Sequence, residues 1–277
     1  MRHHREGSRT WARSFALCPS SLPGIYNESV MKISFLVFLF LLPVFPQTAA
    51  ESSGERGWTV LEAALQAAGG RQKLAAVKDM TFELQSHLVT PEGKFDVRSR
   101  NFLVLPDTVR QDMTLPFGEM TVAFNQSGGW RKGPKGVDPI PVEQLRLTLA
   151  HLARVNTLFK PPEDRATVRW LEAATVNGRT CDVIETTHLG GDPLRLFIDR
   201  ENKNVIKRSY NIENPGGGHS QVEEMLSDFR EVEGLRLSFK VQEIRNGKLA
   251  RESTTHNLKI NTGLKAQDLL REFKTPQ

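Results

Sequence analysis

The sequence predicts a mainly β fold, with some α-helix, built around one strongly curved antiparallel sheet. From residue 80 to residue 260, short segments alternate apolar and polar side chains, as half-buried strands do. Gly, Asn or Pro turns end most of these segments, and Asn177-Gly178 and Asn246-Gly247 are hairpin signals. One helical segment separates two runs of strands, which disfavours a βαβ fold.

A leader is expected to precede this sheet, in residues 1–50. Met31 is followed by Lys32, an apolar stretch over 33–45 and the small residues Thr48-Ala49-Ala50, the pattern of a cleavable export signal. We expect translation to start at Met31, with a longer leader from Met1 as the alternative. Cleavage before Glu51 would release residues 51–277 into the periplasm as a single domain.

Charge and cysteine content argue against a nucleic-acid-binding protein and against a disulfide-linked one. The whole chain has a formal charge of +5, but residues 1–50 hold five basic and two acidic residues, so residues 51–277 carry +2. Basic and aromatic residues are not interleaved as a single-strand nucleic-acid groove requires, so we expect no nucleic-acid partner. Cys181 is the one cysteine of residues 51–277, and we expect it to be buried and unbridged.

Two short helices are expected before the sheet. The first, over 58–68, has Thr59 as its expected N-cap, Gly69-Gly70 as its stop, and apolar residues at helical spacing: Leu61, Ala64, Leu65 and Ala68. A second helical turn is expected over 72–77.

The first run of strands follows. Strands are expected at 80–88, 95–104, 109–115, 120–124 and around Trp130. In the second of these, the apolar residues Phe95 and Val97 are at odd positions, whereas Phe102 and Val104 are at even positions. Since odd and even side chains of a strand point to opposite faces, this change predicts a β-bulge near Arg100.

After Pro141, apolar residues recur at the spacing of an α-helix. Its apolar face comprises Val142, Leu145, Leu149, Leu152 and Val155. The helix either closes one open side of the sheet permanently or acts as a lid over a cavity. Strands then resume at 168–175, 180–187, 194–199, 205–212, 222–232, 235–242 and 248–260, and a short helix at 267–273 closes the chain. We expect about ten or eleven strands in total.

The sequence contains no strong catalytic or metal-binding motif. No Gly-x-Ser-x-Gly elbow or P-loop is present. The histidines beyond the leader lack the spacing of a zinc protease, and they are His87, His151, His188, His219 and His256. We therefore expect a binding protein rather than an enzyme, with no cofactor and no metal.

Several segments resemble a known family. They are Gly69-Gly70 with Lys73-Leu74, Leu105-Pro106-Asp107, Gly129-Trp130, the run from Asp228 to Phe239, Arg245-Asn246-Gly247-Lys248, and Ile260-Asn261-Thr262-Gly263-Leu264. Together they are similar to the bacterial outer-membrane lipoprotein-sorting and carrier superfamily (LolA-like). They also resemble the β-rich domain appended to some insulinase-like peptidases. The resemblance implies an incomplete barrel wrapped round helices, with an apolar cavity that receives acyl chains of a lipoprotein or lipid.

We expect the ligand to contact an apolar surface of the first five strands, covered by the helix after Pro141. The ligand-facing set is Phe82, Leu84, Phe95, Val97, Met113, Met120, Val122, Phe124 and Trp130, and the cover is Leu145, Leu149 and Leu152. The expected partners of this monomer are an acylated lipoprotein or lipid, and envelope membrane proteins.

Two other functions stay open. The first is a non-catalytic envelope interaction module, accessory to a peptidase or secretion system, whose edge strand pairs with a partner. The second, less favoured, is a hydrolase. Met113, Met120, Phe124 and Trp130 facing a void would support the carrier, whereas full packing against the helix over 142–155 would support the module.

Overall fold

The structure is a computed structural model that describes residues 52–91, 93–187, 193–214 and 217–271. All of these residues belong to one compact unit. The predicted leader, with its export signal, and His188 fall outside the described residues.

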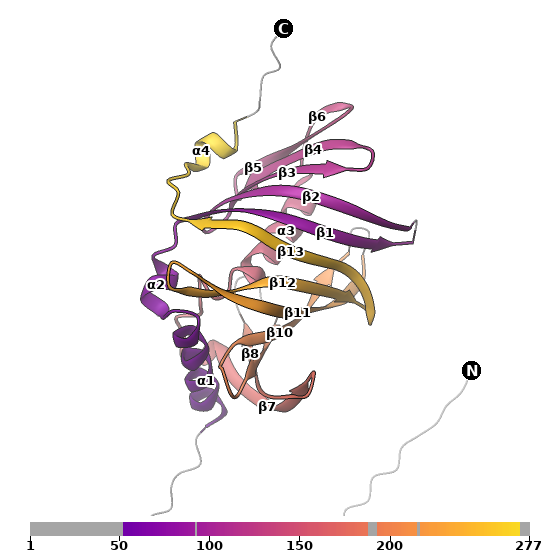
Figure 1. The fold of residues 1–277 in the computed structure, drawn as a ribbon. Coiled ribbons are helices and arrows are strands. Elements are labelled where there is room, and N and C mark those ends of the chain that lie inside the picture. Colours follow the sequence, from indigo (N-terminus) through magenta and orange to yellow (C-terminus); the bar gives the residue numbers. More distant parts are fainter. Residues whose placement is uncertain (1–51, 92, 188–192, 215–216, 272–277) are drawn as a thin grey trace, which may run out of the picture. The chain divides into compact units, whose positions relative to one another are not determined.

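In the described ranges, thirteen strands form one antiparallel sheet (Figure 1). They are β1 (Asp79–Thr90), β2 (Gly93–Val104), β3 (Thr108–Leu115), β4 (Gly118–Asn125), β5 (Gly128–Gly133), β6 (Gly136–Pro139), β7 (Val168–Val176), β8 (Arg179–Thr187), β9 (Pro193–Asp199), β10 (Val205–Glu213), β11 (His219–Val232), β12 (Leu235–Arg245) and β13 (Lys248–Ile260). The order β6-β5-β4-β3-β2-β1-β13-β12-β11-β10-β9-β8-β7 places the last strand between two meanders. The sheet is open, with β6 and β7 at its edges.

This architecture confirms the predicted fold class. The structure has more strands than the ten or eleven expected, partly because β6 is only four residues long. A strand that contains Gly136 and Pro139 is too short to show a clear alternation.

The described helices are α1 (Ser53–Ala67), α2 (Arg71–Ala75), α3 (Val142–Val155) and α4 (Ala266–Leu269), with a 3₁₀ turn at Arg165–Thr167. The bounds of α3 agree with the prediction. The expected N-cap of α1 was wrong. The helix begins at Ser53, five residues before the predicted start, and Ser52 is its N-cap, in a capping box with Glu55. The Thr59 hydroxyl instead donates to the Glu55 carbonyl.

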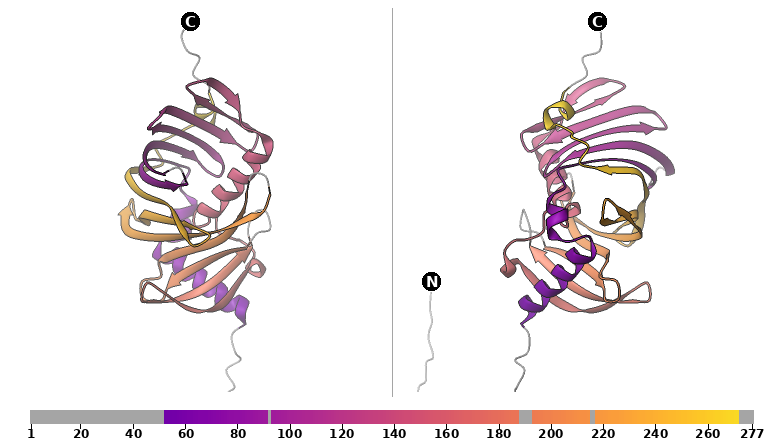
Figure 2. Two further views of the ribbon diagram at one scale, coloured as in Figure 1. Left: turned by 90° about the vertical axis from the view of Figure 1, so that its right-hand side faces the viewer. Right: turned by 60° about the vertical axis from the view of Figure 1, so that its left-hand side comes forward.

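α1 and α3 cover one face of the sheet, which we call the inner face. α1 packs against β7 and β8, while α3 reaches from β5 to β10. Figure 2 shows α3 inside the curve of the strands. The contact of α1 with β7 is close at Gly57, where a Cβ would lie 2.5 Å from the Trp170 backbone nitrogen.

The main hydrophobic core lies between α1 and the inner face. Leu61 and Leu65 of α1 are fully buried, as are Ile184 and Leu235 to within 1%. A smaller cluster of Val176, Cys181 and Ile206 forms separately. Cys181 is 0% exposed, which confirms its predicted burial.

The predicted bulge near Arg100 is wrong. β1 and β2 pair without a shift from Asp79↔Val104 to Thr90↔Gly93. Ser99 and Asn101 therefore share the inner face with Phe95 and Val97. Their burial is tolerated because they are hydrogen-bonded: Asn101 Nδ2 donates to Ser99 Oγ at 3.0 Å, and Gln111 Nε2 donates to Asn101 Oδ1 at 2.9 Å.

Candidate ligand-binding cavity

A cavity of about 290 Å³ lies on the inner face of the sheet, beside α1 and the C-terminal end of α3. Alternation along the strands points one set of apolar side chains into it. The apolar lining comprises Ala64, Ala68, Met80, Phe82, Leu84, Leu103, Val155, Leu158, Phe159, Val205, Leu226, Phe229, Leu237, Val241 and Leu258. This lining is continuous with the main core, and the cavity opens from that core to solvent.

Phe82 and Leu84 are the two residues of the predicted ligand-facing set that line this cavity. The others on β2, β3 and β4 share the inner face by register, because Leu84 pairs with Ser99, Ser99 with Met113, and Met113 with Met120. These other predicted residues do not line the cavity, and they are Phe95, Val97, Met113, Met120, Val122 and Phe124.

Trp130 faces the other side of the sheet. It pairs with Ala123, which alternates with the inner-facing Val122 and Phe124. Its Nε1 donates to the Leu270 carbonyl at 2.8 Å, and the Arg110 guanidinium lies 5.7 Å from its ring centre. Trp130 therefore anchors the chain just after α4 and is not part of the cavity.

The cover over the cavity differs from the predicted leucine face. Leu145 is buried and Leu149 and Leu152 are partly buried, but α3 meets the cavity through His151 and Val155, followed by Asn156. Val142 of the predicted apolar face is 84% exposed, whereas Arg154 is only 8% exposed. Periodicity alone missed this rotation because a buried arginine counts as polar in the sequence pattern.

One end of the cavity is charged, which the predicted site did not include. Arg208 Nε lies 2.8 Å from Glu224 Oε2, and Arg208 Nη1 donates to the Val155 carbonyl at 2.8 Å. Glu224 is 2% exposed. Arg208 therefore connects Glu224, on the sheet side of the cavity, to the C-terminal end of α3.

A second buried carboxylate lies beside this pair. Glu243 accepts from Arg245 Nε at 2.6 Å and lies 2.8 Å from Arg251 Nη2. Burial alone would raise the pKa of Glu243, but Arg251 and Arg245 outweigh burial and hold the pKa below its ordinary value. Glu243 is therefore ionised at neutral pH.

His151 and Tyr210 complete the polar end. Tyr210 Oη lies 3.2 Å from His151 Nδ1. Burial lowers the pKa of His151, although Glu224 opposes the shift, and burial raises the pKa of Tyr210 far above its usual range. Both side chains are therefore neutral near pH 7.

The sequence held a signal for this polar end. Arg208 has the same parity as Tyr210, and Glu224 has the same parity as Val222, so charged residues occupy apolar positions of two strands. Their pairing follows from the β10–β11 register, which places Arg208 opposite Glu224. Single-strand patterns cannot show that register.

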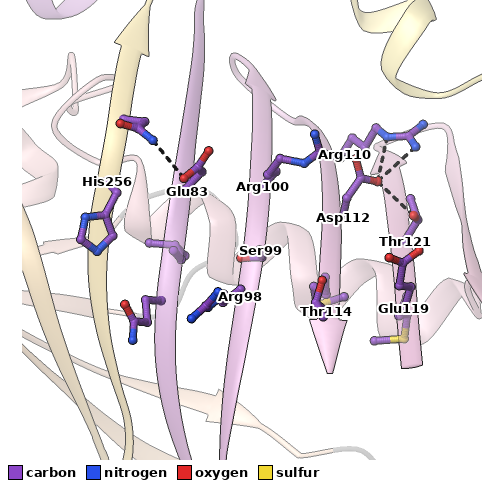
Figure 3. Close-up of a pocket in the computed structure, with 15 residues that line it drawn as sticks. Glu83, Arg98, Ser99, Arg100, Arg110, Asp112, Thr114, Glu119, Thr121 and His256 are labelled. Carbon is purple, nitrogen blue, oxygen red and sulfur yellow. Dashed lines mark hydrogen bonds and ion pairs between the residues drawn. The ribbon is translucent and has the colours of Figure 1, made fainter. Parts of the chain in front are cut away.

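A second, larger hollow of about 880 Å³ lies on the outer face, across β13, β1, β2, β3 and β4. Figure 3 shows Arg98, Arg100 and Arg110 on the same side of the strands as Glu83 and His256. Arg110 Nε donates to Asp112 Oδ1 at 3.1 Å, and the Thr121 hydroxyl donates to the same oxygen at 2.9 Å. This outer groove is open to water, and its lining combines these polar side chains with Leu84, Met113 and Met120.

None of the described helices has the length and apolar character needed to cross a membrane. In the same part of the chain, no group of three or more His, Cys, Asp or Glu side chains is placed to hold a metal ion.

The open curved sheet, with helices inside its curve, defines the fold class of the LolA-like lipoprotein-sorting proteins, as the sequence resemblance led us to expect. No protein-family model matches the chain, and no curated protein matches it significantly. Solved structures do match, and one of them has a TM-score above 0.5.

The LolA superfamily protein NE2245 from Nitrosomonas europaea matches with a TM-score of 0.53 at 10% identity, over 78% of this chain and 97% of that one. An outer-membrane lipoprotein-sorting protein domain from Vibrio parahaemolyticus matches with a TM-score of 0.48 at 13% identity, over 78% and 97%. A DUF1329 family protein from Desulfovibrio piger gives 0.47 at 12% identity, over 77% and 96%. At 10% identity, the likeness to NE2245 shows the fold alone.

Proposed function

We propose that this chain is a non-catalytic binding protein of the bacterial envelope that shelters an acyl chain of a lipid or lipoprotein in the inner-face cavity. The observation that carries the proposal is the mostly apolar cavity of about 290 Å³ that lies between α1, the end of α3 and the inner face. The LolA-like fold of NE2245 supports it.

The size of the cavity limits how much it takes up. Pockets for drug-sized ligands span roughly 300–1,000 Å³, so this cavity lies at the small end of that range. We infer that it accepts one chain in the present arrangement, and that more would require α3 to move. Met113, Met120 and Phe124, which share the inner face, would then extend the lining.

Burial of an acyl chain supplies enough free energy for useful affinity. Each buried methylene contributes about 0.8 kcal/mol, so a chain of about ten methylenes gives about 8 kcal/mol before the costs of ordering. That corresponds to an affinity no tighter than about micromolar. A carrier needs this moderate affinity, because it must release its cargo.

The test is uptake of a fluorescent twelve-carbon acyl probe by the purified protein, wild type and variants. We expect Phe82→Asn and Leu84→Asn each to weaken uptake by about tenfold, because a polar amide would face the buried chain. Phe117→Asn is the matched control, since Phe117 is 72% exposed at the β3–β4 turn. Its uptake should equal that of the wild type.

A wild-type protein that takes up no probe, and carries no lipid in native mass spectrometry of an envelope extract, would overturn the proposal. The interaction module would then be the better explanation. Equal uptake by Phe82→Asn, Leu84→Asn and wild type would show that the chain binds elsewhere.

A further inference from the structure

Four charged residues form one row across the inner face. Arg208 of β10 pairs with Glu224 of β11, Glu224 with Glu243 of β12, and Glu243 with Arg251 of β13. Arg208, Glu224 and Arg251 line the cavity. We call this set the charged row. Buried charges are costly unless they are matched, so the balance of charge along the row matters.

Positive charge exceeds negative charge around the row. Its two carboxylates are faced by the guanidinium groups of Arg208, Arg251 and Arg245. His151, which also lines the cavity, adds no positive charge at neutral pH because burial lowers its pKa. Three arginines thus face two glutamates at the charged end of a mostly apolar cavity.

The same end has unused hydrogen-bonding capacity. Among the described residues that line the cavity, three buried side-chain atoms have no hydrogen-bond partner: Asn156 Nδ2, Arg208 Nε and Glu224 Oε2. The last two lie 2.8 Å apart as an ion pair, so Asn156 Nδ2 is the donor with nothing opposite it. Asn156 directly follows Val155, whose carbonyl accepts from Arg208, so this donor belongs to the same end of the cavity. A buried donor without a partner costs about 1–3 kcal/mol.

We propose that the ligand is a single-chain amphipath with an anionic head, of the fatty-acid class, whose carboxylate lies at the charged row. This inference rests on the proposed function. The chain contacts the apolar lining that includes Phe82 and Leu84, and the carboxylate accepts from Asn156 Nδ2 near Arg208 and Arg251. An ionised head offsets the excess of positive charge and forms charge-assisted hydrogen bonds, which a neutral ester cannot do equally well.

The first test compares dodecanoate with methyl dodecanoate by calorimetry with the whole protein, below the concentration at which either aggregates. We expect dodecanoate to bind at least tenfold more tightly. Equal affinity, or tighter binding of the ester, would overturn the anionic head but leave the acyl-chain cavity standing. Failure of both ligands to bind would overturn the cavity and the head together.

The second test uses a matched pair of variants. Arg251→Gln and Arg245→Gln each leave Glu243 with one arginine, but only Arg251 lines the cavity. We expect Arg251→Gln to weaken dodecanoate binding about tenfold and leave the methyl ester unchanged, while Arg245→Gln changes neither by more than about twofold. A purely structural role would move both ligands in both variants.

Asn156→Leu provides a variant that leaves every ion pair of the row intact. It should weaken dodecanoate binding several-fold while the methyl ester binds as before. Unchanged dodecanoate affinity in both Asn156→Leu and Arg251→Gln would overturn the proposed position of the head.

Discussion

The inner cavity and the outer groove are formed partly by the same strand β1, yet their chemistry differs. Phe82 lines the cavity, Glu83 and Gln85 line the groove, and Leu84 between them contributes to both. The groove is about 880 Å³ and the cavity about 290 Å³, so the larger hollow is the polar one. Water competes for every contact in a polar groove, whereas an apolar cavity gains from displacing it. Volume alone therefore does not identify the binding site.

Charges on the two faces also differ in environment. The outer Arg98 and Arg100 are exposed, so solvent screens them. On the inner face Arg208 and Glu224 are at most 9% exposed, where the loss of one partner leaves the other unsolvated. The same residue types should thus have very different effects on stability.

The largest expected effect comes from this contrast. Arg208→Met removes the ion-pair partner of Glu224, and we expect it to lower the free energy of unfolding by about 3–5 kcal/mol. The exposed Arg100→Met on the outer groove should change it by less than about 0.5 kcal/mol. Urea unfolding followed by circular dichroism measures both. Similar losses in the two variants would mean that the faces do not differ as described.

A smaller effect tests how tightly the inner face is covered. At Gly57 a Cβ would lie 2.5 Å from the Trp170 backbone nitrogen, so Gly57→Ala should destabilise the protein by about 1–3 kcal/mol. At Gly54, in the same helix, the nearest atom would be 3.9 Å away, and Gly54→Ala should stabilise by up to about 1 kcal/mol. Thermal unfolding should give shifts of opposite sign. A gain in both variants would show that α1 can move away from β7.

The smallest effect is a pH dependence of the inner face. The pKa of His151 is lowered by burial in the folded state, so the unfolded chain binds the proton more readily. The stability contribution of neutral His151 is therefore present above its ordinary pKa of about 6.5 and falls as the pH drops below it. His151→Gln should flatten the decline in unfolding free energy between pH 7.5 and 5.5, by less than about 1.4 kcal/mol per pH unit.

The control for this prediction is on the other face. His256 is exposed and lines the outer groove, so His256→Gln should keep the wild-type slope. A wild-type slope in His151→Gln, measured by urea titration at each pH, would contradict the assignment.

Local patterns predicted what depends on neighbouring residues in the chain. Alternation and turn residues located most strands, and the helical period located α3 to the residue. They also placed Phe82 and Leu84 on the apolar side of β1. The capping box of Ser52 and Glu55 was present in the sequence as a Ser-x-x-Glu pattern, and it would have corrected the start of α1.

What the sequence did not predict depends on pairing between distant strands. The polar belt of Ser99 and Asn101 was mistaken for a bulge because its partner Gln111 lies on the next strand. The charged row involves four strands, and no single strand shows that its charges meet. Trp130 was assigned to the cavity because parity within a short strand does not indicate which face carries the helices.

The pairing of β1 with β13 has a consequence for how the chain folds. Met80 lies opposite Ile260, so β1, the first strand in the sequence, pairs with β13, the last. Synthesis from the N-terminus produces β1 to β6 first, with the edge of β1 open until β13 has been made. Such long-range closure slows folding, and an open edge can pair with another molecule. We expect the N-terminal meander on its own to aggregate, and assembly of the full sheet to be limited by the arrival of β13.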